Sequence, residues 1–274
     1  MLFDIFWKWL RKSLSRSSYD WLSYVLFRRR ARYEKLETYT AIFNHYLEKG
    51  LDFKGRTVVE VGSGLQIYTA LYMLRAGADR VLLAEPKVLA REKMAGQASL
   101  FESREGAVAD ALNRITDFRG LQEIPEAYSS NVDLLCSFTV LEHVADLEEF
   151  FRHARRLLKP GAVSYHMVDV SEHTYQFFAR FPILRRLNAR RALFHLRYSD
   201  RAFARLNDPK CFMNRVLLPE YLELAARHGF AVEEVGPEAY AGPCRIHPDV
   251  LKSYSGQPER FLRTNAFSMK LRKL

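Results

Sequence analysis

The stretch Val58-Val59-Glu60-Val61-Gly62-Ser63-Gly64-Leu65-Gln66 decides the fold of this chain. Its first half is apolar and β-branched, which predicts a buried strand. The strand ends after an acidic residue and enters a glycine turn, and a helical pattern follows over residues 68–75. Strand, glycine turn and helix in this order are typical of a nucleotide-type cofactor site, because glycine lets the backbone approach a ligand and a helix N-terminus favours negative charge.

The rest of the chain continues the alternation of strands and helices. Further strands are predicted at residues 80–85, 107–111, 131–137 and 162–168, and helices at residues 34–49, 88–100 and 146–158. Asp146 is the expected N-cap of the last of these helices, with Glu149 three residues later as in a capping box. A helix at 218–228, a strand beginning at 229–232 and an alternating strand at 266–271 complete the chain. This alternation predicts an α/β doubly wound sheet.

Charge is unevenly distributed along the 274 residues, whose net charge is +10. Residues 1–35 carry nine Lys/Arg against three Asp/Glu, and residues 171–216 carry ten against three. The remainder of the chain is therefore slightly acidic, and the basic character belongs to two appendages. An anionic partner is expected at one or both of them. Three cysteines without paired spacing argue against a disulfide framework and for a reducing compartment.

The first segment, residues 1–33, is predicted to be a basic amphipathic helical segment ahead of one domain at 34–274. It has no cleavage site of the kind that ends a signal peptide, and no stretch of the chain reaches the ~18–20 apolar residues of a spanning helix. An aromatic stripe with a basic flank suits peripheral membrane contact through residues 1–30. Packing on the domain or on a second subunit, as in a dimer, and an RNA-binding arm are the alternatives. The expected location is cytoplasmic. If residues 1–30 contact the membrane, the protein would be peripherally attached to its inner face.

Several motifs outside the opening stretch carry a family resemblance. Glu85 ends the second strand 25 residues after Glu60, the element Leu141-Glu142-His143-Val144 follows the fourth strand, and the turn Leu158-Lys159-Pro160-Gly161 precedes the fifth. With these motifs the chain resembles class I S-adenosylmethionine-dependent methyltransferases over residues 50–170 as the core. The resemblance implies a Rossmann-like seven-stranded sheet, mostly parallel with an antiparallel last strand, and S-adenosyl-L-methionine as cofactor.

The resemblance also implies which residues contact this cofactor. Gly62 and Gly64 would lie against its methionine part, Glu60 would order its amino group, Glu85 would hold the ribose and Asp110 would sit beside the adenine. The expected set is Glu60, Gly62, Ser63, Gly64, Glu85, Pro86, Asp110, Ala111 and Ser137. One departure is Gln66, which stands where the family has a third glycine.

Candidates for proton removal follow strands four and five, whose carboxyl ends would face the reacting methyl group. They are His143, Asp169 and His173, and the last two share a face if the chain turns helical there. The competing interpretations are a pocket-packing role for His143 and a structural role for Asp169 and His173 in holding the next segment. His166 lies within a strand and is interpreted as a core or pocket histidine. No metal is expected, because Thr139 occupies the position of the extra acid in metal-dependent relatives.

The insertion at 171–216 is rich in arginine and aromatic residues and is expected to be a lid that forms the acceptor pocket. The predicted function is O-methylation of a small or lipid-linked anionic acceptor, such as a glycan precursor, although N- and C-methylation stay open. The alternatives are an RNA methyltransferase and a non-catalytic cofactor-binding scaffold. Nucleic acid is the less favoured acceptor, because Ser137-Phe138-Thr139-Val140 replaces the Asn/Asp-Pro-Pro-aromatic turn of base-amino methylation.

Overall fold

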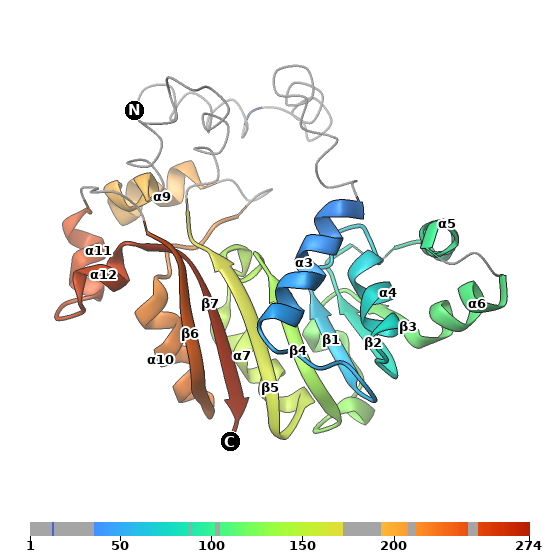
Figure 1. Ribbon diagram of the computed structural model, residues 1–274. Helices are drawn as coiled ribbons and strands as arrows, with labels where there is room; N and C mark the ends of the chain where they lie inside the picture. The colour runs from blue at the N-terminus through green and yellow to red at the C-terminus, as the bar shows by residue number, and fades with distance from the viewer. Residues whose placement is uncertain are drawn as a thin grey trace.

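The computed structural model describes residue 13 and residues 36–87, 89–101, 105–171, 193–207, 212–240 and 246–274. Its centre is a seven-stranded sheet with the strand order β3-β2-β1-β4-β5-β7-β6 (Figure 1). The strands are β1 (Thr57–Val61), β2 (Arg80–Ala84), β3 (Ile115–Phe118), β4 (Val132–Phe138), β5 (Leu158–Asp169), β6 (Phe230–Tyr240) and β7 (Thr264–Lys273). Strands β3, β2, β1, β4 and β5 pair in parallel, and β7 is antiparallel to both of its neighbours. The predicted doubly wound sheet with an antiparallel last strand is confirmed.

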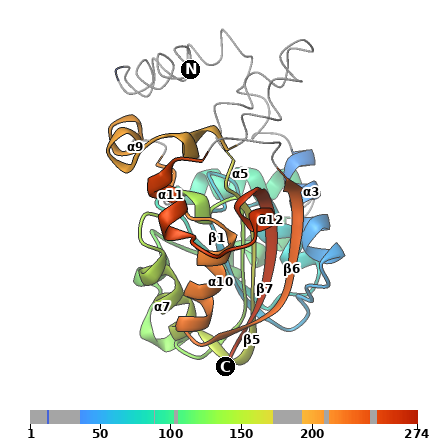
Figure 2. The same cartoon turned by 90° about the vertical axis from the view of Figure 1, so that its left-hand side faces the viewer.

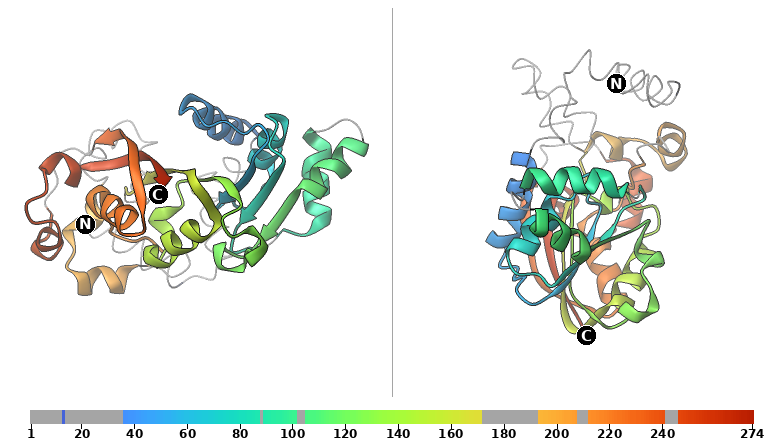
Figure 3. Two further views of the ribbon diagram at one scale, coloured as in Figure 1. Left: turned by 90° about the horizontal axis from the view of Figure 1, so that it is seen from below. Right: turned by 90° about the vertical axis from the view of Figure 1, so that its right-hand side faces the viewer.

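Helices cover both faces of the sheet. The main helices are α3 (Leu36–Glu48), α4 (Tyr68–Arg75), α5 (Arg91–Phe101), α6 (Glu105–Arg114), α7 (Leu147–Leu157) and α10 (Leu218–Arg227). Two views show α3 on one side of the sheet and α7 and α10 on the other (Figures 2 and 3). Shorter helices, α9 (Asp200–Leu206), α11 (Pro248–Ser253) and α12 (Glu259–Leu262), lie toward the end of the sheet where β5 stops (Figure 1).

The core divides at the sheet because successive strand residues point to opposite faces. In β1, Val58 packs with the cluster under α3 and α4, whereas Val59 and Val61 pack with the cluster under α7 and α10. Both clusters are built from fully or nearly fully buried aliphatic and aromatic side chains. A buried strand of this kind reads as a continuous apolar run, which is the pattern of the opening stretch.

Most predicted elements agree with the structure to within a few residues. One of them is α3, which ends shortly before Gly50, a residue with a positive φ of 71°. The expected N-cap is also confirmed, because the Asp146 side chain accepts a hydrogen bond from the Glu149 backbone N–H at 2.8 Å. The third strand is a correction. Residues 107–111 lie in α6, and the strand follows at Ile115–Phe118.

Local helix signals explain this misplaced strand. Val108, Ala111 and Leu112 are spaced three and four residues apart and pack together in the core, and Asp110 pairs with Arg114 one helical turn later. The short apolar run alone favours a strand, whereas this spacing belongs to a helix.

The basic N-terminal segment and the insertion lie mainly outside the described residues. Of residues 1–33 only Ser13 is described, and of the insertion only residues 171, 193–207 and 212–216. Within the described part of the chain, no helix is both long and apolar enough to cross a membrane.

Candidate functional site

The candidate site lies where the strand order reverses, between β1 and β4. Val61 at the end of β1 pairs with Ser137 near the end of β4, and both strands point the same way. From this pair the chain winds outward in opposite directions, to β2 and β3 on one side and to β5 on the other. In open α/β sheets, ligands bind at the carboxyl ends of the strands at this switch point.

Two glycines shape the turn that follows β1. Gly62 and Gly64 have φ values of 74° and 70°, a region that favours glycine. A Cβ atom built on Gly62 would lie only 2.3 Å from Cγ2 of Val140, so no larger residue fits without movement. The Gly62 N–H donates to the carbonyl of Ala84 at 2.9 Å, which joins the turn to the end of β2. The turn is therefore held close to both neighbouring strand ends.

Two buried polar atoms at this turn have no hydrogen-bond partner in the described structure. They are Oε2 of Glu60 and Oγ of Ser63. Burial raises the pKa of the Glu60 carboxyl to about 7, against which a hydrogen bond from Thr69 acts. Orphaned buried polar atoms are costly, so their presence beside a glycine turn indicates a polar ligand that completes them.

Glu85 closes the other side of the turn. Its Oε2 accepts a hydrogen bond from the Gly64 backbone N–H at 3.0 Å. Partial burial raises the pKa of this carboxyl, while hydrogen bonds from the backbone of Gly64 and Lys87 oppose the shift. Glu85 and Pro86 line a cavity of about 630 Å³ with Gly62, Thr139 and His143. A cavity of this size accommodates a nucleotide-sized ligand.

Thr139, on the wall of this cavity, is one of two described non-glycine residues with positive φ, at 53°. Its N–H donates to the Met167 carbonyl of β5 at 2.8 Å, which holds the backbone in this conformation. Strained backbone of this kind concentrates at ligand sites, since the surrounding structure must compensate for it.

His143 ends the short 3₁₀ turn η4 (Leu141–His143) and faces the same cavity. Its Nδ1 lies 2.6 Å from the backbone carbonyl of Phe212, in the last part of the insertion. A carbonyl can only accept, so Nδ1 carries the proton in the neutral ring. Nε2 is then the nitrogen that can accept a proton, which is the state a general base requires.

Asn214 holds the η4 turn in place from the same segment of the insertion. Its Nδ2 donates to the carbonyls of Leu141 at 2.7 Å and Val144 at 3.1 Å, and its backbone N–H donates to the Glu142 carbonyl at 2.8 Å. Its Oδ1 accepts from the Val216 N–H at 3.2 Å and the Tyr221 hydroxyl at 3.3 Å. One side chain therefore joins the turn that carries His143 to the start of α10.

Asp169, at the end of β5, lies beside this turn but does not line the cavity. One of its carboxylate oxygens accepts from the Ser171 N–H at 3.0 Å. Burial, with a contribution from the charge of Asp169, raises the pKa of the fully buried Glu142 well above its usual range. His173 lies outside the described residues, so its pairing with Asp169 stays a prediction.

His166 is a buried core histidine, as interpreted from its place within a strand. Its ring nitrogens lie 2.8 Å from the hydroxyls of Ser137 and Ser164, and burial lowers its pKa to about 3. The Ser137 side chain is thus committed to the core, and only its backbone can face a ligand at the strand end.

Asp110 and Ala111 are placed away from the cavity, which corrects their assignment beside an adenine. Asp110 is exposed on α6 and pairs with Arg114, and Ala111 is buried in the core under that helix. The residues that actually border this end of the cavity follow β3, at Arg119 to Gln122. The error has the same cause as the misplaced third strand.

Three residues near the site were missed by the sequence analysis. His45 of α3 reaches the Tyr165 hydroxyl at 2.7 Å and packs its ring edge against Phe138 at the end of β4, at a centroid distance of 5.3 Å. Phe212 and Asn214 are the other two. Of the three, only His45 leaves a signal in the sequence, as a histidine in the helix ahead of β1. The contacts of Phe212 and Asn214 join segments about 70 residues apart, so no local pattern indicates them.

Comparisons with known proteins bear on the family and the fold. Residues 27–235 match the family model described as a methyltransferase domain. Among solved structures, geranyl diphosphate C-methyltransferase from Streptomyces coelicolor A3(2), in complex with Mg²⁺, geranyl diphosphate and S-adenosyl-L-homocysteine, is 14% identical with a TM-score of 0.51. That likeness covers 86% of this chain and 79% of the other.

A second solved structure is the S-adenosylmethionine-dependent methyltransferase from Mesorhizobium loti, at 18% identity and a TM-score of 0.49 over 85% of this chain and 96% of the other. At such identities the likeness concerns the fold alone. No curated protein matches the sequence.

Proposed function

This chain belongs to the methyltransferase family whose domain model it matches, and we propose that it methylates an oxygen atom of a small or lipid-linked anionic acceptor, such as a glycan precursor. It is an S-adenosylmethionine-dependent methyltransferase. The cofactor, when bound, would supply a methyl group that bonds to a nucleophile as its bond to the sulfonium sulfur breaks, with S-adenosylhomocysteine as the leaving group. The protein must then position the acceptor and, for a hydroxyl, take up its proton.

The residues around the glycine turn fit this cofactor. Glu60 Oε2 and Ser63 Oγ are buried without a partner among the described residues and can accept from an ammonium or donate to a carboxylate, respectively. Glu85 can accept from ribose hydroxyls in exchange for its bond to the Gly64 N–H. A Cβ on Gly62 would meet the Val140 side chain, so a larger residue would shift this turn. We therefore propose that Glu60, Gly62, Ser63, Gly64, Glu85 and Pro86 hold the cofactor.

The contact between His143 Nδ1 and the Phe212 carbonyl is the observation that carries the proposed reaction. The Phe212 carbonyl 2.6 Å from Nδ1 fixes the proton on that nitrogen and directs Nε2 as the base. Methylation of a hydroxyl needs such a base, whereas methylation of a neutral amine can proceed without one. Because Phe212 belongs to the insertion, the segment that would contact the acceptor also orients the base. Asp169 beside the turn is the second proposed participant, through its charge.

The anionic acceptor is supported by the charge of the insertion. Of its basic residues, Arg201 and Arg205 are exposed on α9, which lies at the end of the sheet where β5 stops (Figure 1). Arg215 is committed to the structure, since it pairs with Asp200, donates to the Tyr198 carbonyl and lies over the Phe203 ring. A lipid-linked acceptor also agrees with a cytoplasmic enzyme whose residues 1–30 contact the inner membrane face, which we include in the proposal.

Transfer of labelled methyl groups to separated cell fractions tests this function. The purified chain and labelled S-adenosylmethionine are incubated with anionic lipid-linked glycans, soluble phosphorylated sugars and total RNA, and the label in each fraction is measured. We expect base-stable label in one of the first two fractions and its loss in His143→Ala. Nuclease-sensitive label in RNA would replace the proposed acceptor with a nucleic acid. Absence of S-adenosylhomocysteine binding by calorimetry would contradict the cofactor assignment itself.

A further inference from the structure

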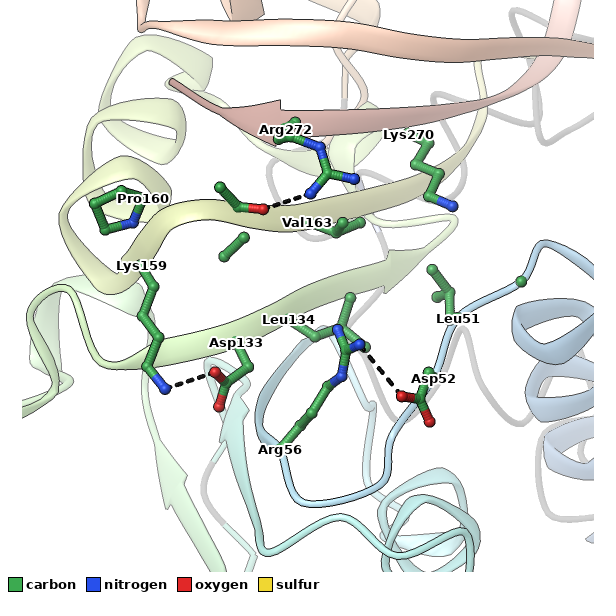
Figure 4. A pocket seen from close by; sticks show the side chains of 13 residues that line it. Leu51, Asp52, Arg56, Asp133, Leu134, Lys159, Pro160, Val163, Lys270 and Arg272 are labelled. Atoms are coloured by element: carbon green, nitrogen blue, oxygen red, sulfur yellow. Dashed lines mark hydrogen bonds and ion pairs between the residues drawn. The ribbon is translucent and has the colours of Figure 1, made fainter.

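A second cavity lies at the other end of the central strands from the cofactor site. It has a volume of about 540 Å³ and opens between the amino ends of β1, β4 and β5 (Figure 4). Asp133 on its wall and Thr139 at the cofactor site are separated by the length of β4, or about 20 Å at the rise of an extended strand. A ligand in this second cavity would not touch the methyl-transfer site.

Basic side chains converge on this cavity from three separate segments. Arg56 comes from the turn before β1, Lys159 from the start of β5, and Lys270 and Arg272 from β7. The last two share one face of the strand because they are two residues apart. Asp52 and Asp133 are the only acidic residues lining the cavity in the described structure, so its wall carries two more positive than negative charges.

The ion pairs within the wall leave one cation uncompensated. Lys159 pairs with Asp133 at 2.6 Å and Arg56 with Asp52 at 3.3 Å. Arg272 pairs with Glu233 and donates to the Gly161 carbonyl at 2.6 Å. The side chain of Lys270, by contrast, makes no hydrogen bond or ion pair with any described residue, although Glu234 stands opposite it in the β6–β7 register.

Figure 4 shows Lys270 and Arg272 extending from β7 toward β5, with Arg56 on the far side of Leu134. The cation left without a carboxylate therefore faces a cavity that already holds three others. Leu134 and Val163 add apolar surface to the same wall.

We propose that this cavity binds a small phosphate-bearing ligand, with Lys270 as its main charged contact and Arg272 and Arg56 beside it. A phosphate can accept from a lysine and from arginine forks at the same time, which suits this arrangement. A volume of about 540 Å³ favours a small molecule over a polynucleotide, which binds along extended grooves. The site is independent of the proposed methyl-transfer function.

Calorimetry with inorganic pyrophosphate on the full chain tests the site. We expect binding by the wild type, about tenfold weaker binding by Lys270→Ala as one charge-assisted contact is lost, and no measurable binding by Lys270→Glu. Lys252→Ala, which removes an exposed lysine of α11, is the matched control and should bind like the wild type. Because the Lys270 side chain has no partner among the described residues, Lys270→Ala should keep the wild-type Tm and the wild-type affinity for S-adenosylhomocysteine.

A parallel sedimentation with phosphatidylcholine vesicles, with and without phosphatidic acid, identifies the source of the phosphate. Binding that needs both phosphatidic acid and Lys270, without binding of free pyrophosphate, supports the site and identifies its ligand as a lipid phosphate. Absence of both interactions in the wild type overturns the proposal. So does an equal loss of affinity in Lys252→Ala and Lys270→Ala, since the binding would then reflect net charge and not this cavity.

Discussion

Replacing Asn214 tests whether the insertion holds the turn that carries His143. Asn214→Ala removes two donors to the carbonyls of Leu141 and Val144 and one acceptor for the Val216 N–H and the Tyr221 hydroxyl. Each such bond contributes about 1 kcal/mol, and the bonds are partly buried and coupled. We therefore expect a loss of about 2–4 kcal/mol in the free energy of unfolding.

Urea unfolding of the wild type and three variants measures this loss. Asn214→Asp keeps the acceptor but removes both donors and places a carboxylate against two carbonyls, so it should destabilise at least as much as alanine. Asn131→Ala is the control, because its side chain makes a single long bond of 3.3 Å to the Ala127 carbonyl at an exposed site. Its effect should stay within about 0.5 kcal/mol.

The ring of His143 supplies a readout that a general loss of stability would not move. Its ¹⁵N chemical shifts should show the Nδ1-protonated tautomer in the wild type, because Nδ1 faces the Phe212 carbonyl. In folded Asn214→Ala we expect a shift toward the Nε2-protonated form that free histidine prefers. Wild-type stability together with an unchanged tautomer in Asn214→Ala would refute this reasoning.

Three further predictions concern the cofactor turn and the base. Burial raises the pKa of Glu60 to about 7 from 4.5, so its stabilising contribution to the cofactor-free protein is complete below about pH 4.5 and is lost as the pH rises through 7. Up to about 3 kcal/mol of the free energy of unfolding should be lost between these limits. Glu60→Gln should flatten the corresponding pH dependence of the Tm, and an unchanged slope would contradict the prediction. Gly62→Ala should weaken S-adenosylhomocysteine binding more than tenfold in calorimetry, because its Cβ would lie 2.3 Å from Val140; wild-type affinity would show that Val140 can move freely. His143→Ala should lower labelled methyl transfer about 10²- to 10⁴-fold with nearly wild-type cofactor affinity, and Asp169→Ala should lower it less; equal transfer by all three proteins would place the base elsewhere.

The sequence by itself determined the fold and the place of the cofactor turn. The apolar run before Gly62, the spacing from Glu60 to Glu85 and the elements after β4 are local signals. Strand burial, turn geometry and helix capping depend on residues close together in the chain, so their patterns can be read without coordinates. The confirmed N-cap at Asp146 is an instance at the level of single atoms.

Local signals can also compete, and the third strand shows where the sequence was insufficient. The apolar residues of 107–111 are compatible with a short strand or with one face of a helix, and the i,i+4 pair of Asp110 with Arg114 belongs to the helix. Because the third strand lies at 115–118, the cavity wall that follows it is formed by Arg119 and the next residues. Asp110 lies in α6 and does not line the cavity.

Only the tertiary structure decided which groups act together. The tautomer of His143 depends on a carbonyl 69 residues later, and the η4 turn depends on Asn214 at a similar separation. The second cavity likewise joins Arg56 to Lys270 and Arg272, which no local pattern connects. These contacts arise because the sheet aligns strands that are distant in the sequence, and this alignment depends on the pairing register, which one segment alone does not carry.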